Sequence, residues 1–381
     1  MKKILLVFGT RPEAIKMLPV AKCLARETEV QTLICVTGQH REMLDQVLSL
    51  FDARPDYDLD IMRRAQGLEH ITTAVLTGVA QVIDQVRPDR ILVHGDTTTA
   101  MAASLAAFYR KVPVGHVEAG LRSGDIGQPW PEEANRRIVS VVTDLHFAPT
   151  ARARDNLLAE GVSAKSIHIT GNTVIDALRF TVDRLRGSQE LETTLASRFD
   201  FLEAEKPILL VTGHRRENFG SPFHSVCEAI RDLAGSGRMQ VVYPVHLNPN
   251  VMAPVNELLG SVPGVHLIEP LDYVPFVYLM QKSHAILTDS GGIQEEGPSL
   301  GKPVFVMRNV TERPEALAAG AVRLVGTDRG RIVSEVLRMF REPDAYDEMC
   351  RAHNPYGDGR AASRIADVLV GREVKEFNAV A

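Results

Sequence analysis

Short apolar runs alternate with amphipathic stretches along the chain. In the first half, the apolar runs bounded by polar or glycine residues lie at 3–8, 30–36, 90–96, 112–120 and 144–149. Runs of this length predict strands that are buried on both faces of a parallel sheet. The stretches between them, such as 13–27 and 98–110, have the spacing of helices. Alternating strands and helices predict a doubly wound α/β sheet.

The alternation weakens over the polar segment 184–206 and then begins again. The second set of apolar runs lies at 207–215, 239–246, 264–270, 284–292 and 302–307. We therefore predict two Rossmann-like domains with a boundary near 171–206. Residues 1–172 and a C-terminal helix at about 358–381 would form the first, and residues 173–357 the second. Two such domains facing each other would form a cleft lined by the carboxyl ends of both sheets, where open α/β sheets bind ligands.

Composition narrows the class of protein. The 381 residues are too many for one ordinary core. A net charge of −5 disfavours nucleic acid and anionic membranes as partners, so an anionic ligand would need a local cluster of basic residues. Four dispersed cysteines without a CxxC argue against zinc and against a disulfide framework, and fit a reducing cytoplasm. The apolar run 4–8 is too short for a signal peptide, and no stretch has the length of a transmembrane helix.

Several common cofactor motifs are absent. No strand is followed by GxGxxG, and "FGTRPEAIK" at 8–16 lacks the second glycine and the Lys-Ser/Thr pair of a Walker loop. No HExxH arrangement suggests a catalytic metal. We therefore expect neither a tightly held dinucleotide nor a metal ion.

Titratable residues follow several predicted strands in the first half. Arg11 and Lys16 lie near a helix N-terminus, where backbone N–H groups favour an anion, although a solvated basic pair fits equally well. Asp96 and Glu118 each end a strand. Asp96 could simply cap the next helix, whereas Glu118 between apolar residues is harder to explain that way. Glu132 follows Pro131 in a first helical turn, where the helix dipole alone favours an acid.

Histidines accompany these strand ends. His94 and His116 lie two residues before Asp96 and Glu118, and a buried core position is the simpler interpretation for both. In the second half, His214 lies between a strand and two arginines, an arrangement that suits an anion clamp.

The stretch "ILTDSGGIQEE" ends the strand predicted at 284–292. Backbone N–H groups of Ser290, Gly291 and Gly292 would form an anion nest at a helix N-terminus, although a plain tight turn fits a Gly-Gly pair as well. Arg313 would approach from the next loop. Cations and a nest suit a pyrophosphate, and carboxylates suit sugar hydroxyls or proton transfer, so the combination suggests a nucleotide-sugar enzyme.

Many segments, in order along nearly the whole chain, closely resemble non-hydrolysing UDP-N-acetylglucosamine 2-epimerases. They are FGTRPEAIKMLP, VTGQHREMLDQVL, VHGDTTTAMAASLAAFY, GHVEAGLRSGD, PWPEEANRR, ITGNTVIDAL, VTGHRREN, YPVHLNPNV, LTDSGGIQEEGPSLGKPV and RAHNPYGDG. The resemblance implies a GT-B-like pair of Rossmann domains with the active site between them. It implies interconversion of UDP-N-acetylglucosamine and UDP-N-acetylmannosamine without a nicotinamide cofactor, and it suggests a homodimer.

The resemblance also implies site residues. The family's catalytic positions fall on Asp96, Glu118, Glu132 and His214. Its nucleotide-sugar-binding positions fall on Arg11, Lys16, Asp96, Glu118, His214, Leu271, Phe276, Ser290, Gly291, Gly292, Glu296 and Arg313. Leu271 departs from the glutamine of close relatives, a change that a backbone contact would tolerate. Glu296, four residues after Gly292, would accept hydrogen bonds from the ribose hydroxyls, while Glu295 would face elsewhere.

Two alternatives remain at this stage. A GT-B glycosyltransferase would have the same cleft, but the carboxylates of the N-terminal domain argue against an acceptor surface there. A nucleotide-sugar sensor is the non-enzymatic alternative. The family suggests regulation by its own substrate at a second site, with residues 39–43 and His246 as participants.

Overall fold

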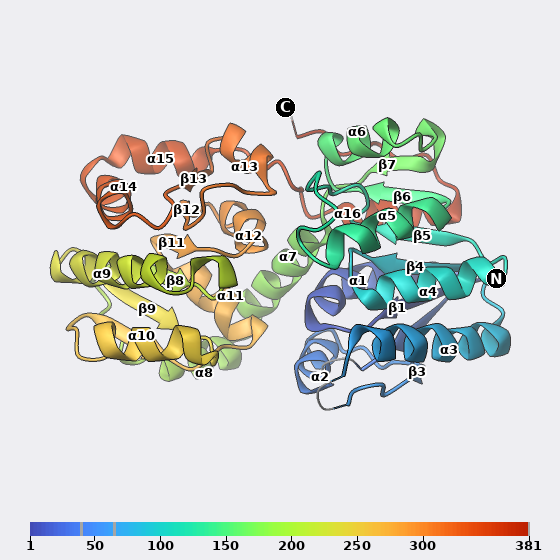
Figure 1. Cartoon of the computed structure of the whole chain (residues 1–381), viewed down its shortest axis with the longest axis horizontal. Coiled ribbons are helices and arrows are strands. Elements are labelled where there is room, and N and C mark those ends of the chain that lie inside the picture. Colours follow the sequence, from blue (N-terminus) through green and yellow to red (C-terminus); the bar gives the residue numbers. More distant parts are fainter. Residues whose placement is uncertain (39–40, 64–65, 380–381) are drawn as a thin grey trace. The chain divides into compact units, whose positions relative to one another are not determined.

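The computed structural model describes residues 1–38, 41–63 and 66–379 (Figure 1). The chain forms two compact α/β units. Unit 1 comprises Met1–Ala177 and the C-terminal segment from Tyr356, and unit 2 comprises Leu178–Pro355.

Unit 1 contains seven strands in one parallel sheet of order β3-β2-β1-β4-β5-β6-β7. The strands are β1 (Lys2–Phe8), β2 (Val30–Val36), β3 (Tyr57–Asp58), β4 (Arg90–His94), β5 (Val114–Val117), β6 (Leu145–Ala148) and β7 (Ile167–Ile169). The helices are α1 (Arg11–Leu24), α2 (Arg41–Leu50), α3 (Leu68–Val86), α4 (Thr98–Tyr109), α5 (Glu132–Val142), α6 (Ala151–Ala159), α16 (Ala361–Val370) and the start of α7 (Thr173–Arg186). Helices α3, α4 and α5 pack side by side in one layer, and α2, α1 and α16 in another (Figure 1).

Unit 2 contains six strands in a parallel sheet of order β10-β9-β8-β11-β12-β13. The strands are β8 (Ile208–Thr212), β9 (Gln240–Pro244), β10 (Val265–Ile268), β11 (Ala285–Thr288), β12 (Val304–Val306) and β13 (Val322–Leu324). The helices, after the end of α7, are α8 (Gln189–Arg198), α9 (Ser221–Gly235), α10 (Pro249–Leu259), α11 (Tyr273–Lys282), α12 (Ile293–Ser299), α13 (Pro314–Ala318), α14 (Arg329–Arg341) and α15 (Pro343–Arg351).

Each sheet is buried on both faces, which explains the continuous apolar runs. Residues Ile4–Phe8 of β1 and Ile208–Val211 of β8 are all less than 9% exposed. Such runs suit parallel strands covered by helices on both sides. The predicted fold class of two doubly wound parallel sheets is therefore confirmed.

The sequence pattern placed some strand ends incorrectly. The run predicted at 112–120 is a strand only over Val114–Val117, because Glu118 and Gly120 adopt φ values of 64° and 87°. Strands β3, β7 and β13 were not predicted, since two or three residues give too little alternation to detect.

The chain order reverses once in each sheet. Strand β1 lies between β2 and β4, and β8 lies between β9 and β11. At such a switch point the loops after the two adjacent strands diverge and leave room for a ligand at the carboxyl end of the sheet. The candidate ligand-binding loops are therefore those after β1 and β4 in unit 1 and those after β8 and β11 in unit 2.

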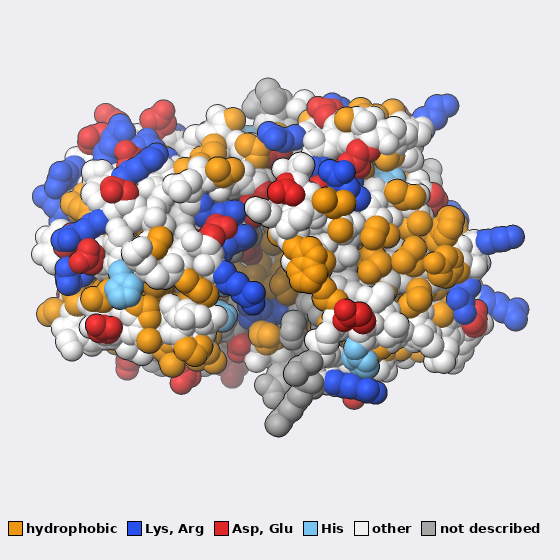
Figure 2. All heavy atoms as spheres, in the orientation of Figure 1, with side chains coloured by type: hydrophobic (Ala, Val, Ile, Leu, Met, Phe, Trp, Pro, Cys, Tyr) orange, Lys and Arg blue, Asp and Glu red, His pale blue; other side chains and the backbone are white. Residues whose placement is uncertain are grey.

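On the face shown in Figure 2, hydrophobic side chains gather over the helical layer that contains α4 and α5. Large apolar side chains exposed on these two helices are Phe108, Tyr109, Ile138 and Val141. Among the described residues, no helix is both long and apolar enough to cross a lipid bilayer.

Candidate active site

The turn between β1 and α1 is held by a buried glutamate. Thr10 is the N-cap of α1, and Glu13 forms a capping box with it. The Glu13 carboxylate accepts hydrogen bonds from the backbone N–H groups of Gly9 (3.0 Å) and Thr10 (2.8 Å) and from the Thr97 hydroxyl (2.6 Å). The N–H groups of Gly9 and Thr10 therefore already bind the chain's own carboxylate and are not available to an external anion.

Lys16, on the next turn of α1, contacts Glu118 after β5. Its ammonium donates to Glu118 Oε2, which also accepts from Asn172 Nδ2 at 2.7 Å. His94 Nε2 lies 3.8 Å from Glu118 Oε1, and the Glu118 side chain is only 8% exposed. Glu118 adopts a left-handed backbone conformation that costs a non-glycine residue roughly 1 kcal/mol. A strained, buried and ion-paired carboxylate is typical of a functional site.

His116 is a structural histidine. It is fully buried, and its Nε2 donates to the carbonyl of Gly95 at 2.7 Å. Burial lowers the pKa of this imidazole to about 3, so it is neutral at pH 7. Its core position agrees with the simpler interpretation of the sequence.

Asp96 lies in the turn after β4 and does not cap α4. Thr97 is the N-cap and accepts from the N–H of Ala100. The Asp96 carboxylate is 26% exposed and binds Arg136 on α5, with 2.5 Å between Oδ2 and Nη2. Asn135 Nδ2 donates to the Asp96 carbonyl at 2.9 Å. Two side chains of α5 therefore fix Asp96.

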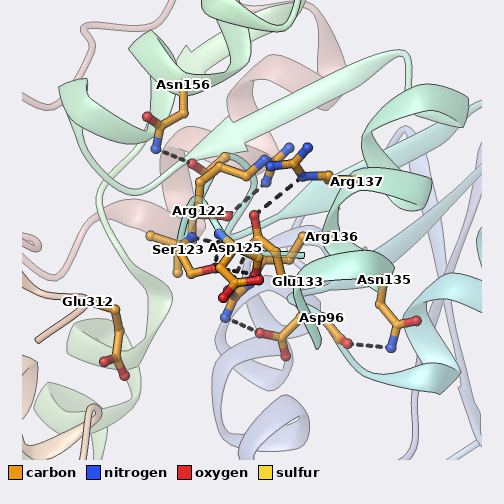
Figure 3. Close-up of polar contacts among 12 residues, drawn as sticks. Asp96, Arg122, Ser123, Asp125, Glu133, Asn135, Arg136, Arg137, Asn156 and Glu312 are labelled. Atoms are coloured by element: carbon orange, nitrogen blue, oxygen red, sulfur yellow. Dashed lines mark hydrogen bonds and ion pairs between the residues drawn. The ribbon is translucent and has the colours of Figure 1, made fainter. Parts of the chain in front are cut away.

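Glu132 and Glu133 begin α5 and have different surroundings; Glu133 is drawn in Figure 3. Glu133 is fully buried; it accepts from the Ser123 N–H at 3.1 Å and lies 3.1 Å from Arg136 Nη1. Glu132 is half-buried, and its Oε2 atom is buried without a hydrogen-bond partner among the described residues. Glu133 therefore stabilises the start of α5, whereas Glu132 keeps an unused acceptor.

Arg11 begins α1 and is half-buried. No ion pair or hydrogen bond of its guanidinium is found within residues 1–38, 41–63 and 66–379. Its charge is therefore not compensated by an acid within that part of the chain.

In unit 2, His214 lies in the loop after β8. Its Nδ1 is 3.9 Å from the buried Asp289, and its ring stacks on His246 with 5.1 Å between centroids. Burial lowers the pKa of the His214 imidazole, against the opposing effect of Asp289, so the ring is neutral at pH 7. Asp289 Oδ2 accepts from the N–H groups of His214 and Arg215 at 2.9 and 2.8 Å, and so fixes the loop.

The turn at 290–292 follows β11. The Ser290 N–H donates to Thr288 Oγ1 at 3.0 Å, so it is not the nest donor that the sequence suggested. Within the described part of the chain, the N–H groups of Gly291, Gly292 and Ile293 have no protein acceptor. The open backbone donors are therefore shifted by one residue toward α12.

Glu296 lies below this turn on the first part of α12. It is 6% exposed and accepts from Tyr273 Oη at 2.7 Å, and its Oε2 lies 3.7 Å from where a Cβ on Gly292 would be. Burial and the adjacent carboxylate raise the pKa of Tyr273 well above its usual range, so the phenol remains a donor. Two further residues expected to contact the ligand are half-buried. Leu271 lies just before α11, and Phe276 lies within it.

Arg313 forms a buried ion pair with the neighbouring acid. Its Nε donates to Glu295, and the two side chains are 10% and 1% exposed. Arg215 and Arg308 lie 3.3 and 2.5 Å from Glu312. Burial raises the pKa of Glu312, but Arg313 and Arg308 outweigh it and lower that pKa to about 2. Much of the positive charge near the 290–292 turn is therefore already compensated.

Four charged residues that organise these turns were not among the predicted site residues: Glu13, Glu133, Arg136 and Asp289. The role of Glu13 could have been predicted, because the sequence Thr-x-x-Glu before an apolar stretch is typical of a capping box. Arg136 and Asp289 act on partners far away along the chain, 40 residues away for Arg136 and Asp96 and 75 for Asp289 and His214. Residues 39 and 40, part of the segment suggested for regulation, lie outside the described residues.

Comparison with known proteins gives consistent results over nearly the whole chain. The family model for UDP-N-acetylglucosamine 2-epimerase matches residues 22–370. The UDP-N-acetylglucosamine 2-epimerase of Escherichia coli K12 is 56% identical over 373 residues, covering 98% of this chain and 99% of that protein.

Solved structures are similar in fold as well. The UDP-GlcNAc 2-epimerase of Neisseria meningitidis bound to UDP-GlcNAc has a TM-score of 0.91 and 51% identity, covering 97% of this chain and 99% of that one. S. aureus MnaA, solved with UDP, has a TM-score of 0.88 and 45% identity, covering 99% and 100%. The protein belongs to a class of α/β enzymes that are built from two doubly wound units and act on nucleotide sugars. More particularly, the chain belongs to the UDP-N-acetylglucosamine 2-epimerase family.

Proposed function

We propose that the protein interconverts UDP-N-acetylglucosamine and UDP-N-acetylmannosamine by inverting C2 of the sugar. The observation that carries this proposal is a 51% identical relative, aligned over 97% of this chain, that was solved bound to UDP-GlcNAc. The presence of Asp96, Glu118 and Glu132 in unit 1, and of a turn with open backbone N–H donors in unit 2, supports it.

The chemistry explains why the site contains both acids and bases. The hydrogen on C2 is not acidic, because no carbonyl is adjacent to it. We propose elimination: a base takes the C2 proton, the C1–O bond breaks, and UDP leaves with that electron pair, giving 2-acetamidoglucal. UDP then adds back to C1 while a proton is delivered to the opposite face of C2.

Residues of unit 1 would handle the protons. Carboxylates perform proton transfer well when they are poorly solvated and precisely placed. Glu118 is held by Lys16 and Asn172, and Asp96 by Arg136. Glu132 has a buried oxygen without a partner in the described chain, and so can accept a proton or a substrate hydroxyl.

Residues of unit 2, together with Arg11, would bind UDP and stabilise it as it leaves. Departure of UDP increases the negative charge on the diphosphate, which N–H donors and cations stabilise. The N–H groups of Gly291 and Gly292 and the side chains of Ser290 and His214 suit that role. Leu271, Phe276 and Glu296 would contact the nucleoside, and Arg313 would act through its ion pair with Glu295.

We further propose a cytoplasmic homodimer that needs neither a metal nor a nicotinamide and supplies N-acetylmannosamine units for a surface polysaccharide. The exposed apolar side chains on α4 and α5 support association of two copies. Regulation by a second molecule of substrate, with His246 as a participant, belongs to the same proposal, and a sigmoidal dependence of rate on UDP-N-acetylglucosamine would support it.

One NMR time course tests the proposed reaction. UDP-N-acetylglucosamine is incubated with the protein in heavy water without any acceptor. We expect UDP-N-acetylmannosamine to appear, deuterium to enter C2 and little UDP to be released. Stoichiometric free UDP and free sugar would contradict the proposal.

Two variants test the assigned residues. Glu118→Gln and Asp96→Asn should each reduce turnover at least 100-fold, as is typical of lost acid–base groups, while UDP still binds in calorimetry. Near-normal turnover in both would refute their roles.

A further inference from the structure

Arg136 lies between two carboxylates at the start of α5 (Figure 3). Its Nη2 is 2.5 Å from Asp96 Oδ2, and its Nη1 is 3.1 Å from Glu133 Oε2. The Arg136 side chain is 12% exposed and Glu133 is fully buried. One guanidinium therefore joins a buried acid to an acid proposed to act on the substrate.

Glu133 is a firm anchor for this guanidinium. It also accepts from the Ser123 N–H and pairs with Arg137 Nε at 3.5 Å. A buried carboxylate held by several donors has little freedom to move. The position of Arg136 is thus determined by the protein core, independently of any ligand.

We infer that Arg136 is a positioning residue for proton transfer at C2, holding Asp96 by Oδ2 so that Oδ1 faces the substrate. The inference rests on the proposed epimerase function. Within the described residues, no donor to Asp96 Oδ1 is found, and Asn135 fixes the Asp96 main chain through its carbonyl. The carboxylate therefore has one occupied and one available oxygen.

The planar fork of arginine is needed for this arrangement. Arginine presents N–H donors at fixed angles and can bond two carboxylates at once, whereas a lysine ammonium is a single point of charge. Although burial lowers the pKa of Arg136, Asp96 and Glu133 raise it above its usual value, so the bridge keeps its charge at all working pH values.

Glu132 lies one helical turn before Arg136 on α5 and, unlike Asp96, is not held by a cation within the described part of the chain. Its buried Oε2 has no hydrogen-bond partner among the residues described, and no basic side chain pairs with it there. Arg136 of α5 thus fixes Asp96, whereas Glu132 on the same helix has no cation fixing it among the described residues.

Arg137 offers a matched control for the test. It lies on the same helix and also pairs with Glu133, but its side chain is 43% exposed and it does not contact Asp96. We expect Arg136→Met to lower kcat about 100-fold, the scale of a misplaced general acid or base, with KM changed less than about threefold. Arg137→Met should keep kcat within about twofold of wild type.

A conservative variant separates positioning from folding. Arg136→Lys can reach one carboxylate, so we expect kcat about tenfold below wild type and above that of Arg136→Met. If Arg136→Met fails to fold by circular dichroism, this variant decides: a tenfold loss of kcat at unchanged UDP affinity supports the inference.

The outcomes distinguish the two proposals. Wild-type kcat in Arg136→Lys and Arg136→Met, or equal losses in the Arg136 and Arg137 variants, would overturn the positioning role while wild-type epimerisation stands. A wild-type protein that does not epimerise would overturn both.

Discussion

Two turns of the molecule share a spacing and differ in what they can bind. In the β1–α1 turn of unit 1, Glu13 follows Gly9 by four residues; in the β11–α12 turn of unit 2, Glu296 follows Gly292 by four. Glu13 bends back and accepts from the turn's own N–H groups. Glu296 accepts from Tyr273 instead. The first turn is closed by its own acid, and the second keeps its donors available.

The residue at the start of each helix explains the difference. Thr10 has an extended backbone (φ −118°, ψ 160°), which directs the glutamate at the third helical position back toward the turn. Gly292 is already helical (φ −62°, ψ −40°) and has no side chain to cap with. A glycine turn followed by a glutamate is therefore insufficient to predict an anion site; the capping residue decides.

The largest effect is expected from removing the acid that closes the first turn. Glu13→Ala leaves two backbone N–H groups and the hydroxyls of Thr10 and Thr97 without their acceptor. We expect the free energy of unfolding to fall by about 3 kcal/mol, because buried unpaired donors are costly. Urea denaturation measures this. Glu296→Ala, which removes the partner of Tyr273, should lose about 1 kcal/mol; equal losses would remove the distinction between the turns.

A third turn, after β4, is closed by a histidine and therefore responds to pH. His116 has a pKa of about 3 in the folded protein, because burial disfavours its charged form, against 6.5 when unfolded. The unfolded chain takes up the proton first, so stability is retained above pH 6.5 and falls as the pH drops below it. The loss should be about 2 kcal/mol at pH 5.

Comparing His116→Gln with wild type isolates the contribution of His116 to the pH dependence of stability. Urea denaturation at pH 7.5 and pH 5 should give a difference between the two pH values that is smaller by about 2 kcal/mol in the variant. His224→Gln, at an exposed position, should behave as wild type. An unchanged difference in His116→Gln would show that this group does not govern the pH response.

The open turn should discriminate between ligands. Glu296→Gln should weaken UDP binding about tenfold, or about 1.4 kcal/mol, because the proposed acceptor for the ribose hydroxyls becomes a poorer one. Pyrophosphate, which has no ribose, should bind within about twofold of wild type. Isothermal calorimetry with both ligands measures this, and equal losses would show that Glu296 acts only on the turn.

The smallest effects concern the two glycines. A Cβ on Gly291 would lie 3.0 Å from Glu312 Oε1, whereas the nearest atom to a Cβ on Gly292 is 3.7 Å away. We expect Gly291→Ala to weaken UDP binding about threefold, by displacing Glu312, and Gly292→Ala to leave it unchanged. Calorimetry that ranks them in the opposite order would contradict the geometry of the open turn.

The sequence predicted the elements that carry a strong pattern. Buried parallel strands such as β1 and β8 are continuous apolar runs, and the two-sheet class follows from their alternation with helices. Strand β13 is three residues long, and its central Arg323 interrupts the apolar run, so local pattern could not find it.

The site residues were predicted one at a time, but their partners were not. Arg136 is 40 residues from Asp96, and Lys16 is 102 residues from Glu118, so only the folded sheet brings each pair together. The 290–292 turn was predicted from its glycines. The Ser290 N–H is not available to a ligand because it donates to Thr288 Oγ1. That bond depends on the rotamer of Thr288, which the sequence pattern does not specify.

Unit 1 is built from both ends of the chain. Asp176 accepts from the N–H groups of Ala361 and Ala362, and the Phe377 N–H donates to Ile169 in β7. Helix α16 then packs on α1, so the layer that covers one face of the first sheet is completed by the last helix.

Because α16 completes unit 1, the two units are completed in a fixed order during translation. Domains commonly fold as they leave the ribosome, the N-terminal one first. Here every residue of unit 2 is translated before α16 exists, so the second unit can be complete while the first still exposes the apolar side of α1. A chain that ends at residue 355 would contain all of unit 2 and lack the last helix of unit 1.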